Sequence, residues 1–375
     1  MLSRPSAAGG RILTDRLAAR PGGDVAAEEI IRVDWCPGGT IRGSVQTATF
    51  APSLLLRNPH IQTILASSRL RLRPPNPVNR SARSVILAAG EGVRLLGWFS
   101  APPSERPIKG IVIILHGWEG SAFSTYCVRT GNRLLRNGYA VFRLNFRDHG
   151  GSHDLNAGLF YASALEEVFQ AVRRAAGMLT GVPAFIVGFS LGGNFALRIA
   201  RRCLREPIEN LKHVVCISPV LNPEKATARI DATAYIRVYF LRKWRRSLRR
   251  KEVLFPQRYD FSRLSSVTSV RGLTDALLAR FSDFGSTRAY FNSYTLLGDA
   301  LQSIPLPITL LTAADDPIIA VDEFEHLRLN RLATLSIQRH GGHNGFIEGL
   351  DLKSWYEPLL VKLFDVAVKG ARAPE

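Results

Sequence analysis

Short apolar runs alternate with amphipathic stretches along most of the chain. Continuous apolar runs lie at 111–115, 140–145, 184–187, 212–217 and 306–312. Runs of this length are typical of strands that are buried on both faces of a parallel sheet. Helical spacing of apolar residues marks the stretches at 124–136, 161–179 and 191–204. The pattern therefore predicts an α/β fold, with a mostly parallel central sheet and helices on both of its faces.

The same pattern extends to both ends of the predicted sheet. The segments 84–89 and 93–99 flank Gly90-Glu91-Gly92, which predicts an antiparallel hairpin as the first two strands. The run at 333–338 is expected to be the last strand. Residues 54–67 are expected to form a short helix and a turn that pack on the core.

The pentapeptide Gly188-Phe189-Ser190-Leu191-Gly192 lies between a predicted strand and a predicted helix. This setting is the one that a G-x-S-x-G nucleophile elbow requires, because a sharp turn there lifts the serine hydroxyl clear of the sheet. Ser190 is therefore the candidate nucleophile. A serine is weakly nucleophilic at neutral pH, so the hypothesis needs a base and an acid further along the chain.

Candidates for the acid and the base follow the last two predicted strands. Asp315 and Asp316 come after the run at 306–312, and Asp316 is favoured because it leads directly into Pro317, with Asp315 as the second choice. His340 and His343 follow the last strand, and His343 is favoured because two glycines before it free its loop to approach the serine. In this arrangement the histidine accepts the serine proton and the aspartate orients the imidazole ring.

A further loop supplies a candidate oxyanion hole. His116-Gly117-Trp118-Glu119-Gly120-Ser121 follows the strand at 111–115. One backbone N–H donor is expected at Leu191, next to the nucleophile, and the other at Trp118. His116 is interpreted as a structural residue that orients its loop. Arg147-Asp148-His149-Gly150-Gly151-Ser152 is interpreted in the same way, as a structural turn.

The segments that carry these candidates resemble the YheT-type α/β-hydrolases, a group of esterases and lipid hydrolases. The matching motifs are Asn58-Pro59-His60-Ile61-Gln62-Thr63, His116–Ser121, Gly188–Asn194, Asp315-Asp316-Pro317 and His340–Phe346. The first of these motifs is the most specific, since general hydrolases of this fold lack it. The resemblance implies the α/β-hydrolase fold, a triad of Ser190, Asp316 and His343, and hydrolysis of carboxylic esters with short or medium acyl chains or of lipid esters.

The alternation of strands and helices breaks after Ser218-Pro219, and 222–300 are mostly helical in pattern. Insertions at this place in the fold commonly form a cap over the active site, which is expected here. The predicted organisation is therefore a flexible or irregular segment at 1–50, a core at 51–221, a helical cap insertion at 222–300, and the second part of the core at 301–375.

The stretch 237–251 within the predicted cap is strongly basic, and the whole chain has a formal net charge of +18. Ile236, Phe240, Trp244 and Leu248 recur there at helical spacing. The favoured interpretation is a cap helix that packs this apolar stripe against the core. Peripheral contact of the basic helix with an anionic membrane is the alternative, and nucleic acid is the least favoured partner because no motif for it is present.

Composition excludes several classes of protein. The four cysteines show neither disulfide nor metal-ligand spacing, and Cys203 and Cys216 are expected to be buried. No run approaches the ~20 apolar residues of a membrane span. A secretory signal is not expected, because the first residues contain no continuous apolar run, and an organelle transit peptide at 1–23 is the weaker alternative to a tail rich in Gly, Ala and Pro. A cytoplasmic location, at most peripheral to a membrane, is expected. Neither a metal nor an organic cofactor is expected, and the sequence does not indicate an oligomeric state. The same triad is compatible with ester hydrolysis, acyl transfer and thioester cleavage, so all three reactions remain open. A non-catalytic membrane-associated module remains a separate alternative.

Overall fold

An eight-stranded sheet forms the centre of the protein in a computed structural model that describes residues 49–72, 76–103 and 107–372. The predicted N-terminal segment at 1–50 lies almost entirely outside these ranges. The strands are β1 (Arg83–Ala88), β2 (Arg94–Ser100), β3 (Gly110–Leu115), β4 (Tyr139–Leu144), β5 (Ala184–Phe189), β6 (Leu211–Ile217), β7 (Ile308–Ala313) and β8 (Ala333–Gln338). Their order is β1-β2-β4-β3-β5-β6-β7-β8.

The sheet is antiparallel at one edge and parallel elsewhere. β1 pairs with β2, and β2 pairs with β4, in antiparallel register. From β4 across to β8 all neighbours are parallel, so their carboxyl ends meet at one edge of the sheet. This confirms the α/β-hydrolase fold and the initial hairpin, and it gathers the loops that follow β3, β5, β7 and β8 at one place.

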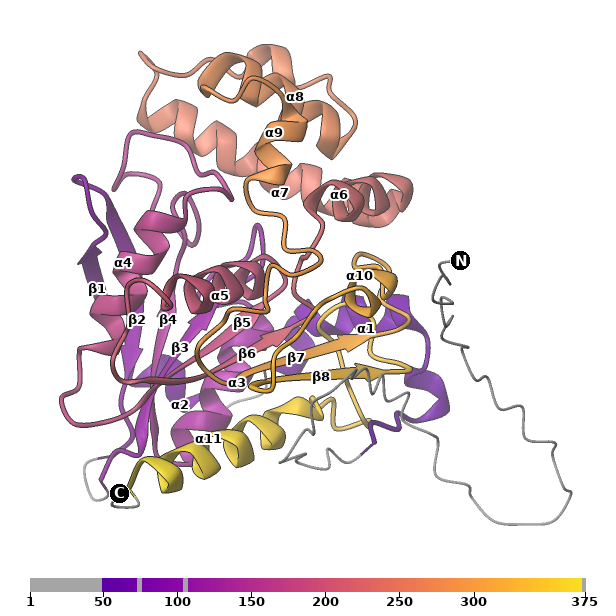
Figure 1. Ribbon diagram of the computed structural model, residues 1–375. Helices are drawn as coiled ribbons and strands as arrows, with labels where there is room; N and C mark the ends of the chain where they lie inside the picture. The colour runs from indigo at the N-terminus through magenta and orange to yellow at the C-terminus, as the bar shows by residue number, and fades with distance from the viewer. Residues whose placement is uncertain (1–48, 73–75, 104–106, 373–375) are drawn as a thin grey trace, which may run out of the picture.

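Helices cover both faces of the sheet (Figure 1). The helices of the described residues are α1 (Pro59–Ser67), α2 (Pro77–Arg80), α3 (Thr125–Arg136), α4 (Leu165–Ala176), α5 (Leu191–Arg202), α6 (Pro223–Ala232), α7 (Ala234–Leu254), α8 (Val270–Phe281), α9 (Thr287–Asn292), α10 (Asp322–Glu325) and α11 (Tyr356–Arg372), with short 3₁₀ turns at Leu54–Leu56, Arg69–Arg71 and Ser262–Leu264.

Two hydrophobic clusters lie on the two sides of the sheet. Ile111 and Ile113 of β3 point to the side of α4 and α5, whereas Val112 and Ile114 point to the side of α3 and α11. Each of these four side chains is fully buried. Burial on both faces explains why the strands appear in the sequence as continuous apolar runs. Cys203 and Cys216 are buried free thiols, as expected.

One predicted helix is shorter in the structure than the pattern indicated. The stretch 161–179 was expected to be helical throughout, but α4 extends only from Leu165 to Ala176. The residues before it turn back toward the segment between β6 and β7, where the Tyr290 hydroxyl accepts a hydrogen bond from the Ala162 N–H at 3.0 Å. A tertiary contact therefore replaces the first turn of the predicted helix.

The segment between β6 and β7 forms α6, α7, α8 and α9, which lie beyond the carboxyl edge of the sheet in Figure 1. One end of α7 is held to the core by a buried ion pair. The Lys251 Nζ lies 2.6 Å from Asp148 Oδ1, and the lysine side chain is 1% exposed. The same ammonium donates to the carbonyl groups of Asn156 and His153, so all three of its protons have acceptors.

Candidate active site

The turn between β5 and α5 holds Ser190 in a strained conformation. Its φ is 54° and its ψ is −116°, backbone angles that residues other than glycine rarely adopt. Close packing requires the glycines on either side. A Cβ atom on Gly192 would lie 2.3 Å from the Leu115 carbonyl oxygen, and one on Gly188 would lie 2.4 Å from the Gly192 carbonyl oxygen. The G-x-S-x-G pattern is therefore explained by the backbone of this turn.

Two hydrogen bonds connect Ser190, His343 and Asp316 in sequence. The Ser190 Oγ lies 2.9 Å from His343 Nε2, and His343 Nδ1 lies 2.8 Å from Asp316 Oδ2. A carboxylate can only accept, so Nδ1 carries the proton and donates it to Asp316, while Nε2 accepts from the serine hydroxyl. This tautomer is the one that can receive the serine proton.

The carboxylate of Asp316 is buried, and several hydrogen-bond donors surround it. Its side chain is 1% exposed, and its Oδ1 accepts from the backbone N–H groups of Ile318 at 2.8 Å and Ile319 at 2.9 Å. The other oxygen accepts from His343. Hydrogen bonds of this kind stabilise an ionised carboxylate in the interior.

The structure separates the two aspartates that the sequence left as alternatives. Asp315 does not contact His343, because its Oδ1 accepts from the Gly342 N–H at 2.8 Å and its Oδ2 lies 3.5 Å from His340 Nδ1. Burial raises the pKa of Asp315, and the bond from Gly342 opposes this rise. Asp315 and His340 therefore brace the loop that carries His343.

The Asn58-Pro59-His60-Ile61-Gln62-Thr63 motif lies against the loop of His343. The Thr63 Oγ1 accepts a hydrogen bond from the His343 N–H at 2.9 Å, and Gln62 both donates to the Ile347 carbonyl and accepts from its N–H. A Cβ atom on Gly342 would lie 2.4 Å from the Pro59 carbonyl oxygen. The motif therefore positions the histidine loop, a role that sequence reasoning missed although the motif itself was the signal.

Two buried histidines hold the loop of the predicted oxyanion hole. His149 donates from Nδ1 to the Arg147 carbonyl at 2.7 Å and accepts the Glu119 N–H at Nε2, at 3.1 Å. His116 likewise bonds the Gly117 carbonyl and the Phe146 N–H. Burial lowers the pKa of His149 to about 4 and that of His116 well below its ordinary value, so both rings are neutral at pH 7.

The two predicted oxyanion donors are the backbone N–H groups of Trp118 and Leu191. Trp118 lies on the loop that follows β3, and Leu191 is the first residue of α5. Neither N–H has an acceptor among the described residues. The N-terminus of α5 adds a partial positive charge at Leu191, which favours an anion there.

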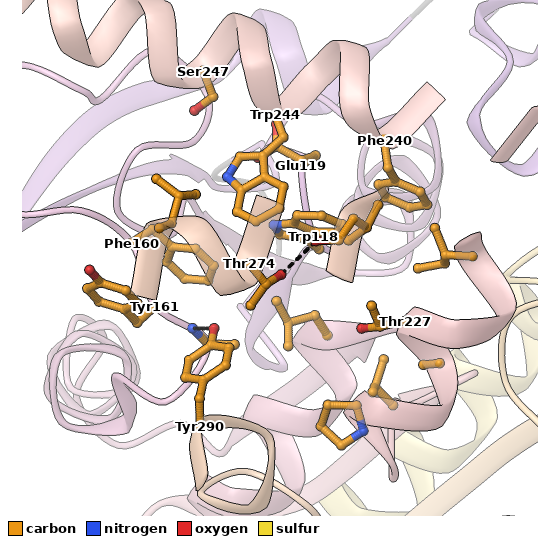
Figure 2. Close-up of a pocket in the computed structure, with 18 of the residues that line it drawn as sticks. Trp118, Glu119, Phe160, Tyr161, Thr227, Phe240, Trp244, Ser247, Thr274 and Tyr290 are labelled. Carbon is orange, nitrogen blue, oxygen red and sulfur yellow. Dashed lines mark hydrogen bonds between the residues drawn. The ribbon is translucent and has the colours of Figure 1, made fainter. Parts of the chain in front are cut away.

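Ser190 and His343 open onto a mostly apolar cavity beneath the helices that follow β6. Figure 2 shows Trp118, Phe240 and Trp244 gathered at one wall. The rings of Trp118 and Phe240 stack at 5.1 Å, and Trp244 meets Trp118 edge-on at 5.0 Å. The opposite wall contains Phe160, Tyr161 and Tyr290.

The apolar stripe of α7 faces inward. Ile236 and Leu248 are buried, and Phe240 and Trp244 line the cavity. The stripe is therefore occupied by contacts within the protein, as in the favoured interpretation, and contact of the basic helix with a membrane stays a prediction. The basic residues of 237–251 do not all have the same surroundings. Lys251 is buried and Arg245 donates to the Val267 carbonyl, whereas the charged residues on the outer face of α7 are exposed.

Two kinds of feature are absent from the part of the chain that the structure describes. No helix in these ranges has the length and apolar composition needed to cross a bilayer. Within the same ranges, no group of three or more His, Cys, Asp or Glu side chains could hold a metal ion.

Comparison with known proteins identifies the family of the chain. A model of the alpha/beta hydrolase family matches residues 112–351. The chain is 25% identical to "Putative esterase YheT" of Escherichia coli, over 83% of this chain and 91% of that protein. It is 24% identical to human "Monoacylglycerol lipase ABHD2", over 84% of this chain and 79% of that protein. Among solved structures, the Pyrococcus furiosus esterase Pf2001 has a TM-score of 0.50 and 19% identity, covering 80% of this chain and 93% of that one.

Proposed function

Since the chain belongs to the alpha/beta hydrolase family, we propose that it is a serine hydrolase that cleaves carboxylic esters through an acyl-enzyme on Ser190. The observation that carries this proposal is the chain of hydrogen bonds from Ser190 through His343 to Asp316, at 2.9 and 2.8 Å. A serine nucleophile with a neighbouring base is suited to acyl transfer. The esterase and lipase relatives support ester hydrolysis at the same general level.

In the first half of the proposed reaction, the Ser190 Oγ attacks the ester carbonyl carbon as its proton passes to His343 Nε2. The carbonyl π bond opens and places the charge on the oxygen, where the N–H groups of Trp118 and Leu191 stabilise it. His343 then gives its proton to the alcohol oxygen, the C–O bond breaks and the alcohol leaves. Asp316 stabilises the imidazolium that exists between these steps.

The second half releases the acid. Water replaces the alcohol, loses a proton to His343 and attacks the acyl carbon. The proton then returns to the Ser190 Oγ as its bond to the acyl group breaks. Acyl transfer to another alcohol, or cleavage of a thioester, uses the same groups and differs only in the acceptor or the leaving group. Both remain alternatives to ester hydrolysis.

The substrate class proposed here is an ester of a short or medium acyl chain, or a lipid ester. Apolar side chains make up most of the cavity beside Ser190, which suits an acyl chain. The relative named a monoacylglycerol lipase supports lipid esters in particular.

Peripheral contact with an anionic membrane is a second part of the proposal, and it rests on the outer face of α7. This face carries exposed Tyr235, Val238, Tyr239, Arg242, Arg246, Arg249 and Arg250. Aromatic and apolar groups beside arginines suit the surface of an anionic bilayer, where each cation contributes ~1 kcal/mol. The cavity lies on the inner side of the same helix, so contact with a membrane would bring lipid esters close to the site.

Substrate assays test the proposed reaction. Purified protein should hydrolyse p-nitrophenyl esters in a series from C2 to C12, and Ser190→Ala should remove the activity. A matching series of acyl thioesters, and added alcohols as acceptors, separates the alternatives. If wild type and Ser190→Ala are equally inactive on every member, the protein is not a serine hydrolase of esters, and a non-catalytic module becomes the better account.

A further inference from the structure

Most charged side chains that line the catalytic cavity are already paired. Asp148 accepts from Lys251 Nζ at 2.6 Å through Oδ1 and from the Phe160 N–H at 2.9 Å through Oδ2. The Lys251 ammonium donates its two other hydrogen bonds to backbone carbonyl groups. The Lys251 ammonium therefore has no proton left for a ligand, and each Asp148 oxygen already has a partner within the cavity wall.

Glu119 is the exception among the carboxyl and amino groups of this wall. Its backbone is held on both sides, because its N–H donates to His149 Nε2 at 3.1 Å and its carbonyl accepts from Lys243 Nζ at 2.6 Å. Its φ is 54°, so the turn is a strained one. Within the described part of the chain, nothing donates a hydrogen bond to its carboxyl group. Figure 2 shows Glu119 beside Trp118 and Trp244.

Glu119 is partly exposed, and its carboxyl group is accessible from the cavity instead of being sealed in the wall. A polar group of a ligand in the cavity can therefore supply the hydrogen bond that no protein group within the described ranges gives it. Burial raises the pKa of Glu119 to about 8, a rise that Lys243 opposes and Asp148 assists. The carboxyl group is therefore mostly protonated at neutral pH and can both donate and accept a hydrogen bond.

We propose that Glu119 hydrogen-bonds a free hydroxyl group on the alcohol part of the ester, so that the enzyme prefers partial esters of polyhydric alcohols, such as monoacylglycerols, over esters of simple alcohols. This inference rests on the proposed ester hydrolysis. Glu119 directly follows Trp118, the proposed oxyanion donor, which places it close to the ester carbonyl. A hydroxyl group on the adjacent carbons of the alcohol lies near that carbonyl, whereas an unsubstituted acyl chain offers no partner.

Sites built to bind a substrate hydroxyl discriminate strongly against analogues that lack it, because the polar group of the protein then stays unpaired. Glu119 is thus assigned a role in specificity. Its effect belongs in the preference between substrates, not in the rate with every ester.

The test compares two substrates with the same acyl chain: 1-decanoylglycerol and methyl decanoate. The quantity measured is the ratio of their kcat/KM values. Glu119→Ala should lower this ratio at least ~10-fold, whereas Glu119→Gln, whose amide still donates and accepts, should keep it within ~3-fold of wild type. Glu91→Ala is a matched control, since Glu91 also has a positive φ of 46° but is exposed on the turn between β1 and β2. It should leave the ratio unchanged.

An equal loss of activity on both substrates in Glu119→Ala would overturn the inference, because it would mean that the residue supports the oxyanion loop only. An unchanged ratio would overturn it as well. Methyl 3-hydroxydecanoate distinguishes the position of the hydroxyl: selective loss on this ester would assign Glu119 to the acyl part instead. If wild type hydrolysed none of these esters, the proposed function would fail first.

Discussion

The backbone N–H of His343 donates a hydrogen bond to the Thr63 hydroxyl at 2.9 Å, although the two residues are 280 positions apart in the sequence. The same hydroxyl donates to the Pro59 carbonyl at 2.7 Å within α1. Thr63 therefore links the first helix of the fold to the loop that carries the proposed base. This contact gives the Asn58–Thr63 motif a physical role in the site.

Loss of the Thr63 hydroxyl should reduce catalysis through the position of His343. Thr63→Val keeps the shape of the side chain but leaves the His343 N–H without its acceptor, which costs ~1–3 kcal/mol. We expect kcat to fall ~10-fold or more, since a small displacement of a base is enough for that, with a smaller change in KM. Thr63→Ser restores the hydroxyl and should restore most of kcat. Equal kcat values for wild type and Thr63→Val would show that the contact does not position the base.

The two neighbouring aspartates should differ sharply in their effect on the rate. Asp316→Asn replaces the acceptor of the His343 Nδ1–H with an amide, which allows the wrong tautomer, and we expect kcat to fall ~10³–10⁴-fold. Asp315→Asn keeps an oxygen that can accept the Gly342 N–H, so the loss should stay below ~10-fold. Steady-state kinetics on one p-nitrophenyl ester is sufficient. The reverse order of the two variants would refute the proposed role of Asp316.

Activity should decline in alkaline solution because of Glu119. Its pKa is about 8, so its negative charge appears beside the proposed oxyanion hole as the pH rises through that value, and repulsion disfavours the developing oxyanion. A plot of kcat against pH should fall above pH 8 in wild type. Glu119→Gln has no such charge and should stay level there. Parallel profiles for the two proteins would assign the decline to another group.

The same shift predicts a change in stability. The pKa of Glu119 is raised above the ordinary 4.5, so between pH 4.5 and about 8 the folded protein retains a proton that the unfolded chain releases. The free energy of unfolding should therefore decrease across this window. Glu119→Gln removes that contribution, and chemical denaturation at several pH values can compare the two proteins.

The outer face of α7 should bind anionic membranes in a salt-dependent manner. Sedimentation with vesicles that contain an anionic phospholipid should exceed that with neutral vesicles, and it should weaken as salt screens the charges. Replacement of Arg242, Arg246, Arg249 and Arg250 by Ser should abolish the difference. Arg245→Ser is the control, because Arg245 is directed at the Val267 carbonyl. Undiminished binding by the fourfold variant would exclude this face as the source.

The strands and the loops that follow them could be predicted from the sequence because burial on both faces leaves a strong apolar signal. The order of Ser190, Asp316 and His343 along the chain was readable for the same reason, since each follows a recognisable strand. The structure brings their side chains into contact. The choice between Asp315 and Asp316 depended on how the chain turns after β7, which the sequence could only suggest.

Contacts between residues that lie far apart in the chain could not be predicted from the sequence. The apolar spacing of α7 identified a stripe at Ile236, Phe240, Trp244 and Leu248 and favoured packing against the core, but the side chains that the stripe contacts could not be named. The role of Thr63 required knowledge that α1 packs against a loop near the other end of the chain. Nothing in the sequence assigned a role to Glu119, because only its place on the cavity wall and the lack of a partner for its carboxyl group among the described residues distinguish it from other carboxylates.

The central claim is that Ser190 is an activated nucleophile in this protein. The most direct measurement is labelling with a fluorophosphonate probe, followed by identification of the modified peptide by mass spectrometry. The account predicts a covalent adduct on Ser190, slower labelling in His343→Ala, and none in Ser190→Ala. Failure of the folded wild-type protein to react, or an adduct on a different serine, would contradict it.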